Sequence, residues 1–357
     1  MSQSSALYQP LDKGKPEIRL LEVVPATTGD APMEVKMVTR DLKQAVSDGF
    51  IPLSYVWGDE RYTKTIIVNG IDKEVRMNLA TFLRYIRETV IPVRPWQEFY
   101  KGKVLFWADA ICVNQSDVDE RSHQVSLMNA IYSSSKVVVC WLGVSQDAHL
   151  AFELFKTIHQ EWFRKGVQAM GSDVPYHDCD PNYGNWMSRC PDFWRTELEN
   201  GIGNEYWNAA KRLLESEYWS RVWILQEIAL PQRPLMLSGS TVVPFSYALT
   251  TCWWVLSLRH RNPLRPLMMN EYLFTRLISG LWLKFYNIPR IFALDQSKFV
   301  DVNQNLTLIS KYTDFQASDP RDKIFALLGR TKMNSTASYR DTTEDAYSTW
   351  ITELRNL

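Results

Sequence analysis

The sequence lacks any excess of charge, because 40 basic residues balance 40 acidic ones in a chain of 357. No global field therefore favours nucleic acid or an anionic membrane surface, and neither is expected as a partner. A long apolar run is also missing, since the most apolar stretch, "YALTTCWWVLSL", is too short and too interrupted to span a bilayer. We expect a soluble protein with no membrane span.

Cysteine is scarce, with five residues, an odd number, scattered without a CxxC pair and without a secretory leader before them. This usage indicates a reducing environment, so the expected location is cytoplasmic. The polar cluster from His177 to Asp180, with Cys190 nearby, lacks the regular spacing of metal ligands, and no metal site is expected.

Familiar catalytic motifs are absent as well. The sequence contains no P-loop, HExxH or GxSxG motif, and Gly201-x-Gly203 lacks a third glycine and a preceding strand. These absences leave the usual nucleotide, zinc and serine-hydrolase sites unsupported, and no resident cofactor is expected.

The pattern that is present alternates strands with helices. Apolar runs at 51–57, 104–107 and 136–143 predict buried strands, and Asn69-Gly70 predicts a hairpin turn. Between them, helical spacing follows Asn78 and Ser116, which are the expected N-caps. The order of strand, helix, strand, helix and strand predicts an α/β fold with a doubly wound, mostly parallel, flavodoxin-like sheet.

Three regions are expected along the chain. Residues 1–45 form a lead and an edge strand, "EIRLLEVVPA", that ends near Pro25. Residues 46–235 form the main domain, with an insert at about 147–205 that contains an amphipathic helix from Asp147 to Trp162. Residues 236–357 form a large, mainly helical C-terminal region.

A polar cluster runs from Asp109 to Arg121, between the C-terminal end of a predicted strand and the start of the next helix. Open α/β sheets bind ligands at that edge. The alternative is that these side chains cap the loop, with an ion pair between Asp109 and Arg121. Cys112 in this cluster is either a nucleophile activated by a helix N-terminus or a small buried thiol.

Three blocks of the sequence closely resemble the fungal heterokaryon-incompatibility (HET) domain. They are "PLSYVWGD" (52–59), "WADAICVNQSDVDERSHQVSLMNAIYSSSKVVVCWLG" (107–143) and "WSRVWILQEIAL" (219–230), and "SDPRDKIFALLG" (318–329) resembles a segment that often follows this domain. Ala108 stands where the family usually has Ile, and Ser135 where it often has Ala. The resemblance implies an intracellular fungal protein of non-self recognition that triggers cell death when incompatible cells fuse.

A more distant resemblance concerns mechanism, because HET domains are thought to be related to TIR domains. "SRVWILQEI" is similar to the TIR pattern in which an acidic residue follows a Trp by one helical turn, and the acidic residue here is Glu227. The resemblance implies that Glu227 is the catalytic residue of an NAD glycohydrolase, with NAD as substrate and not as cofactor. The residues expected to bind the substrate are Trp57, Gly58, Asp109, Asn114, Gln115, Glu120, Arg121, Arg221 and Trp223.

Other functions remain open on the sequence alone. Glu227 could instead anchor its helix through an ion pair, for which Arg221 is a poor partner at a helical spacing of six, so Arg121 is the expected partner. A non-catalytic self-association module and a nucleotide sensor are the alternatives to an enzyme. The expected partners are further copies of the chain and an unidentified incompatibility protein. An enzyme further requires that Glu227 and the Asp109 loop meet at one sheet edge.

Overall fold

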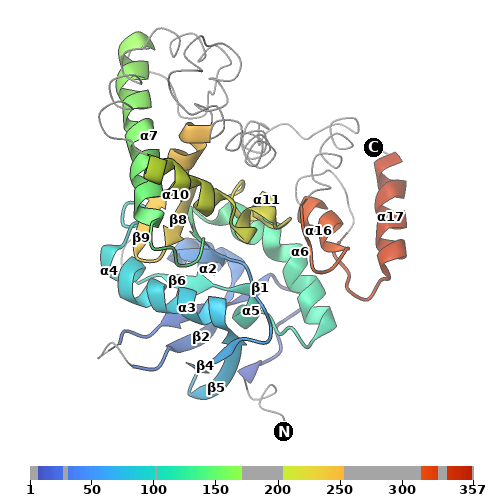
Figure 1. Cartoon of the computed structure of the whole chain (residues 1–357). Coiled ribbons are helices and arrows are strands. Elements are labelled where there is room, and N and C mark those ends of the chain that lie inside the picture. The colour runs from blue at the N-terminus through green and yellow to red at the C-terminus, as the bar shows by residue number, and fades with distance from the viewer. Residues whose placement is uncertain are drawn as a thin grey trace. The chain divides into compact units, whose positions relative to one another are not determined.

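The computed structural model describes residues 7–26, 31–100, 103–170, 204–252, 315–328 and 336–355 (Figure 1). The chain divides into two compact units, each built from separate stretches of sequence. The first comprises residues 1–143, 220–242 and 297–357, and the second comprises 144–219 and 243–296. The region expected to follow residue 236 is therefore shared between the two units.

The first unit is built on a nine-stranded mixed sheet with the strand order β5-β4-β2-β1-β6-β3-β7-β8-β9. The strands are β1 (Glu17–Val23), β2 (Glu34–Asp41), β3 (Phe50–Ser54), β4 (Thr63–Val68), β5 (Ile71–Arg76), β6 (Leu105–Trp107), β7 (Val137–Trp141), β8 (Arg233–Ser238) and β9 (Thr241–Pro244). The α/β class is thereby confirmed.

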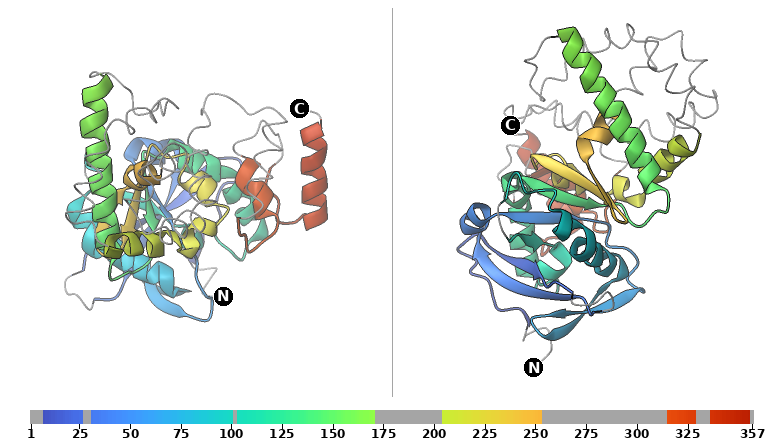
Figure 2. Two further views of the ribbon diagram at one scale, coloured as in Figure 1. Left: turned by 45° about the horizontal axis from the view of Figure 1, so that its top comes forward. Right: turned by 90° about the vertical axis from the view of Figure 1, so that its left-hand side faces the viewer.

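The expected mostly parallel sheet is not confirmed. Four neighbouring strands, β6, β3, β7 and β8, are parallel, but β1 pairs antiparallel with both β2 and β6, and β4 pairs antiparallel with β5. The short connection at 24–33 explains this difference, because only antiparallel neighbours can be joined without a long crossover. β1 is an interior strand instead of the expected edge strand, because it lies between β2 and β6 (Figure 2, β1 and β2 in blue).

Helices cover both faces of the parallel strands. Successive side chains of a strand point to opposite faces, and the register places Trp107 and Ser54 on one face and Trp141 on the other. Tyr132 of α6 (Val118–Ser134) meets Trp107 edge to face, with ring centroids 5.9 Å apart. Phe82 of α3 (Met77–Tyr85) stacks on Trp141 at 5.3 Å. The two helices therefore lie on opposite faces.

Of two local predictions from the sequence, the hairpin turn is confirmed and the N-cap at Asn78 is wrong. The hairpin at Asn69-Gly70 is confirmed, and both residues have positive φ, 52° and 78°, as a type I′ turn requires. The N-cap of α3 is Arg76 and not, as expected, Asn78. Its amide instead donates to the Val56 carbonyl at 2.5 Å and accepts from the Trp141 indole at 2.8 Å, tying α3 to the strand ends.

The N-cap of α6 is one residue later than expected. The Asp117 side chain, not that of Ser116, accepts hydrogen bonds from the backbone N–H groups of Asp119 and Glu120. The negative charges in this first turn also match the positive end of the helix dipole.

The other helices in the described residues of the first unit are mostly short. They are α2 (Leu42–Asp48), η1 (Ile86–Val90), α4 (Ile91–Val93), α5 (Asp109–Cys112), α11 (Ile224–Glu227), α16 (Asp322–Leu328) and α17 (Thr343–Arg355). No helix in the described parts of the chain is long and apolar enough to cross a membrane.

The second unit contains α7 (Ala148–Met170) and α10 (Asn204–Leu214), which pack on each other. It also contains η3 (Glu217–Ser220), except for Ser220, which is assigned to the first unit. The helix expected from Asp147 is thus confirmed. On α7, His159 lies 4.4 Å from the Tyr247 ring and hydrogen bonds to Thr250 at 2.9 Å. Burial lowers the pKa of His159 to about 4, so this imidazole is neutral near pH 7.

Candidate functional site

Glu227 ends the single-turn helix α11 and is 3% exposed. Arg221 donates two hydrogen bonds to its carboxylate, from Nη1 to Oε2 at 2.7 Å and from Nη2 to Oε1 at 2.9 Å. The Ser54 hydroxyl, at the C-terminal end of β3, donates to the same Oε2 at 2.5 Å. This fork geometry fixes the carboxylate in both position and orientation.

The expectation that Arg221 is a poor partner for Glu227 is wrong. A spacing of six prevents pairing only when both residues lie on one helix. Arg221 precedes α11, and its backbone forms an isolated bridge with Gln316. Its side chain therefore reaches the carboxylate from outside the helix. Arg121, the expected partner, lies elsewhere.

Asp109 forms a second, half-buried carboxylate site two residues after the end of β6. The Tyr55 hydroxyl donates to its Oδ1 at 2.7 Å and the Trp57 indole donates to its Oδ2 at 2.8 Å. Burial, reinforced by the charge of Asp109, raises the pKa of Tyr55 well above its usual value, so the phenol remains a donor. Asp109 thus has these neutral donors as partners, and not the Arg121 of the alternative ion pair.

Both carboxylates are bound at the same end of β3. Ser54 and Tyr55 are consecutive residues at the end of β3, and one binds Glu227 while the other binds Asp109. The charges of both carboxylates act on the fully buried Tyr132, whose pKa is raised by burial and then by Glu227 and Asp109. Glu227 and Asp109 are thus bound at one sheet edge, as the prediction required, through the neighbouring residues Ser54 and Tyr55.

Glu120 and its loop are fixed by contacts with β1 and with the backbone of the loop itself. Arg19 and Glu120 form a buried pair at 2.5 and 2.9 Å, and the Asn114 backbone N–H donates to Glu120 at 2.7 Å. Gln115 closes the loop by donating to the Asp109 carbonyl at 3.0 Å. These three residues, which were predicted to bind the substrate, have loop-fixing partners within the protein.

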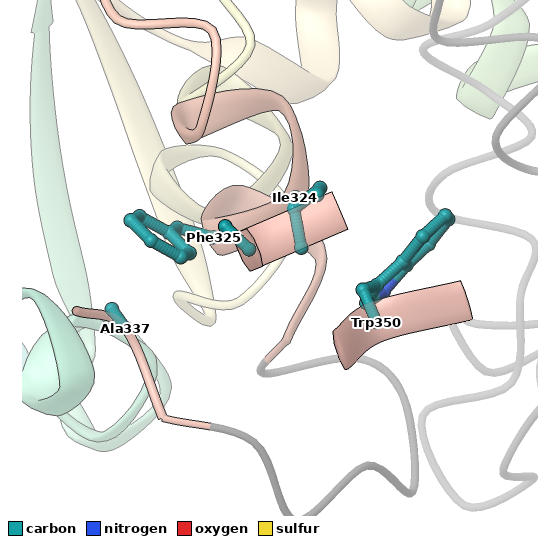
Figure 3. Packing of buried hydrophobic residues seen from close by; sticks show 5 residues of the cluster. Ile324, Phe325, Ala337 and Trp350 are labelled. Carbon is teal, nitrogen blue, oxygen red and sulfur yellow. The ribbon is translucent and has the colours of Figure 1, made fainter. Parts of the chain in front are cut away.

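Arg121 and Trp223 face the C-terminal part of the first unit. The Arg121 guanidinium lies 4.0 Å from the centroid of Tyr339, and Trp223 packs against the buried cluster that includes Ile324 and Phe325 (Figure 3). Neither residue is brought to Asp109.

The remaining predicted residues, Trp57 and Gly58, lie just beyond β3. Arg76 sits 5.2 Å from the Trp57 ring centroid and donates to the Gly58 carbonyl at 2.6 Å. Gly58 has φ 80°, a conformation that other residues rarely adopt, and this is a reason for glycine in the "VWGD" block. One edge of Trp57 is thus fixed by Asp109 and one face by Arg76.

Cys112 is fully buried, and burial raises the pKa of its thiol to about 12. The buried-thiol interpretation is therefore the correct one, because an attacking cysteine needs a low pKa and access. Within the described ranges, no group of three or more His, Cys, Asp or Glu side chains could hold a metal ion. The cluster from His177 to Asp180 lies outside those ranges.

Sequence reasoning missed four residues of these networks: Ser54, Tyr55, Tyr132 and Arg19. The signal for the first two was a Ser-Tyr pair at the end of an apolar strand, where a buried hydroxyl requires a polar partner. Nothing local distinguished Arg19, whose partner Glu120 is 101 residues away.

Comparison with known proteins assigns this arrangement to a family. Residues 50–227 match the family model described as Heterokaryon incompatibility protein (HET), so the chain belongs to the HET-domain proteins. It is 34% identical over 238 residues to "Heterokaryon incompatibility protein 6, OR allele" of Neurospora crassa, an alignment that covers 63% of this chain. The chain spans about a third of the length of that curated relative (34%). No solved structure matches the chain.

Proposed function

We propose that the chain acts in fungal non-self recognition and that its HET domain triggers cell death by hydrolysing the nicotinamide glycosidic bond of NAD. The non-self recognition role is supported by the family match and by the printed name of the Neurospora relative. In this proposal the protein acts in the cytoplasm, after self-association and in response to an incompatibility partner.

The observation that carries the enzymatic proposal is the place of the Glu227 carboxylate, 2.5 Å from Ser54 at the C-terminal end of β3. Numbered along the chain, the parallel strands β3, β6, β7 and β8 lie in the order 2-1-3-4. Flavodoxin-like sheets share this order and bind ligands where it reverses, between the first and third strands. Those strands are β3 and β7 here, so the order supports a TIR-like site beside Ser54.

The chemistry requires a fixed negative charge. As the bond between nicotinamide and ribose breaks, its electron pair leaves with the nicotinamide and positive charge builds on the ribose. A preorganised carboxylate stabilises that charge, and Glu227 supplies it while a water molecule adds to the ribose and releases a proton. The products are nicotinamide and ADP-ribose.

Two groups support Glu227 in this proposal. Arg221 occupies one lone pair on each carboxylate oxygen, and Ser54 takes a second on Oε2, which leaves Oε1 with capacity to face the ribose. Asp109, with Trp57 fixed beside it, is placed to bind the ribose hydroxyls or present a flat surface to a base.

A second candidate function is a non-catalytic signalling module that self-associates. The observation in its favour is the pairing of Glu227, whose 3% exposure and bidentate contact with Arg221 are typical of a structural ion pair. A nucleotide sensor that binds without turnover is a variant of this candidate. Thermal stabilisation by NAD without hydrolysis would identify it.

The test is nicotinamide release from NAD by the purified chain, clustered through a fused oligomerisation tag. Glu227→Gln keeps the size and the hydrogen bond from Ser54 but removes the charge, and should lower turnover by about 100-fold or more. Glu88→Gln, in an exposed pair with Arg84, is the matched control and should leave turnover unchanged. No release from folded, clustered wild type would reject the enzyme and favour the signalling module.

A further inference from the structure

The segment that follows the HET match, residues 315–328, contacts the site at two points. The backbone of Gln316 accepts from the Val222 N–H at 2.9 Å and donates to the Ser220 carbonyl at 2.6 Å. These two bonds make a parallel bridge with Arg221. They fix the backbone that carries the arginine of the Arg221–Glu227 pair.

The second contact fixes the other end of the pair. Gln226, beside Glu227, is 2% exposed, and its Nε2 donates to the carbonyls of Ala326 at 2.9 Å and Phe325 at 3.4 Å. Both carbonyls lie in the last turn of α16, where backbone carbonyls have no partner within the helix. Gln226 therefore satisfies the end of α16, and α16 in turn holds the helix that carries Glu227 (Figure 1).

The charged residues of "SDPRD" hold the segment itself in shape. Asp319 and Arg321 form a double hydrogen bond at 2.6 and 2.9 Å, and Arg321 also donates to the carbonyls of Tyr339 and Asp341. Asp322, at the start of α16, accepts from the Tyr339 hydroxyl at 2.5 Å.

Asp322 also lies near the HET blocks, since burial raises the pKa of its carboxyl group and the nearby Trp223 side chain opposes that rise. Trp223 lies one residue before α11. The apolar residues Ile324 and Phe325 belong to a buried cluster that also includes Trp350 of α17 (Figure 3). Trp223 packs against this cluster. The packing of Trp223 on this cluster thus joins the segment to the turn that carries Glu227.

We propose that residues 315–328 are a positioning element of the site, which holds the Arg221–Glu227 pair through Gln316 on one side and Gln226 on the other. The element makes no contact with substrate, and Gln226 is a positioning residue. The catalytic consequence rests on the proposed function, whereas the structural consequence does not. Without this element, α11 is a single turn, too short to be stable alone.

The test uses hydrogen exchange in the full chain, with two changes at one residue. Asp322→Ala removes the acceptor for the Tyr339 hydroxyl at the start of α16, and should speed exchange of the amides from Val222 to Ile228 by about tenfold or more. Asp322→Asn keeps an acceptor oxygen and should restore exchange to within about threefold of wild type. Amides of β7 should not change in either variant, because that strand is held by its ladders with β3 and β8.

Arg340→Ala is the matched control, since it breaks an exposed ion pair between the C-terminal part and Asp119 without touching α11. Its exchange from Val222 to Ile228 should equal that of wild type. If Asp322→Ala speeds exchange of α16 but leaves α11 as in wild type, the positioning proposal is overturned. Should this variant unfold, which loss of protection in β7 would reveal, Gln226→Leu replaces it with the same expected result for α11.

Turnover adds a second readout. Misplacing Glu227 without altering substrate contacts should lower kcat for nicotinamide release with KM unchanged in Asp322→Ala, and Asp322→Asn should restore kcat. Wild type that releases no nicotinamide would refute the enzymatic function and leave the exchange result to decide the positioning proposal alone.

Discussion

The ion pair between Arg221 and Glu227 makes a quantitative prediction about stability. Replacing Arg221 with Met leaves a carboxylate whose side chain is 4% exposed with Ser54 as its one remaining partner among those described above. Breaking a buried pair in this way costs about 3–5 kcal/mol of unfolding free energy. Replacing Glu227 with Met leaves a guanidinium that is 17% exposed and can reach water, so we expect the lower end of that range.

The double variant, Arg221→Met with Glu227→Met, should cost much less than the sum of the two. Two apolar side chains of similar volume require no partner, and such replacements are often neutral or stabilising. We expect about 0–2 kcal/mol for the double variant and therefore a coupling of at least about 4 kcal/mol.

The assay is urea unfolding followed by tryptophan fluorescence, with the midpoint and the slope determined for each variant. Arg84→Met removes an exposed arginine at 3.3 Å from Glu88, and this control should cost less than about 0.5 kcal/mol. Single variants that cost under about 1 kcal/mol, or costs that add within about 0.5 kcal/mol, would refute the argument that this pair is a buried, coupled unit.

Three further predictions follow from the same networks. Cys112, with its pKa raised to about 12, should resist iodoacetamide at pH 8 in the folded chain and react after unfolding in urea; rapid labelling of the folded chain would contradict its burial. Tyr55→Phe removes the donor to Asp109 and should cost about 1–3 kcal/mol by urea unfolding, with no loss indicating that water replaces it. His159 has a pKa lowered from 6.5 to about 4, so its contribution to stability is present above pH 6.5 and is lost as pH falls toward 4. Thermal unfolding across that range should show a smaller acid loss for His159→Gln than for wild type.

The parts of the fold that could be predicted are those in which sequence neighbours determine the outcome. The turn at Asn69-Gly70 needs positive φ at two adjacent residues, and the buried face of α3, which includes Phe82 and Leu83, follows from helical spacing. The strand β2 was missed because its burial does not alternate cleanly, and with it the antiparallel pairing of β1.

The candidate site was less predictable because its bonds join distant residues. Ser54 and Glu227 are 173 residues apart, and neither position carries a signal for the other. The Arg221–Glu227 pair was not predicted because a spacing of six is unfavourable for two residues on one helix, whereas Arg221 lies outside α11. Glu227 was identified through family resemblance, and its surroundings required the structure.

The place of β1 in the sheet bears on how this domain can be cut from the chain. A fragment limited to residues 50–227 would lose β1 and β2 on one side of the parallel strands and β8 on the other. It would expose the unpaired edges of β6 and β7, and such edges promote aggregation. It would also leave the buried Glu120 without its partner Arg19. The segment recognised as a domain by sequence is therefore shorter than the smallest piece that should fold.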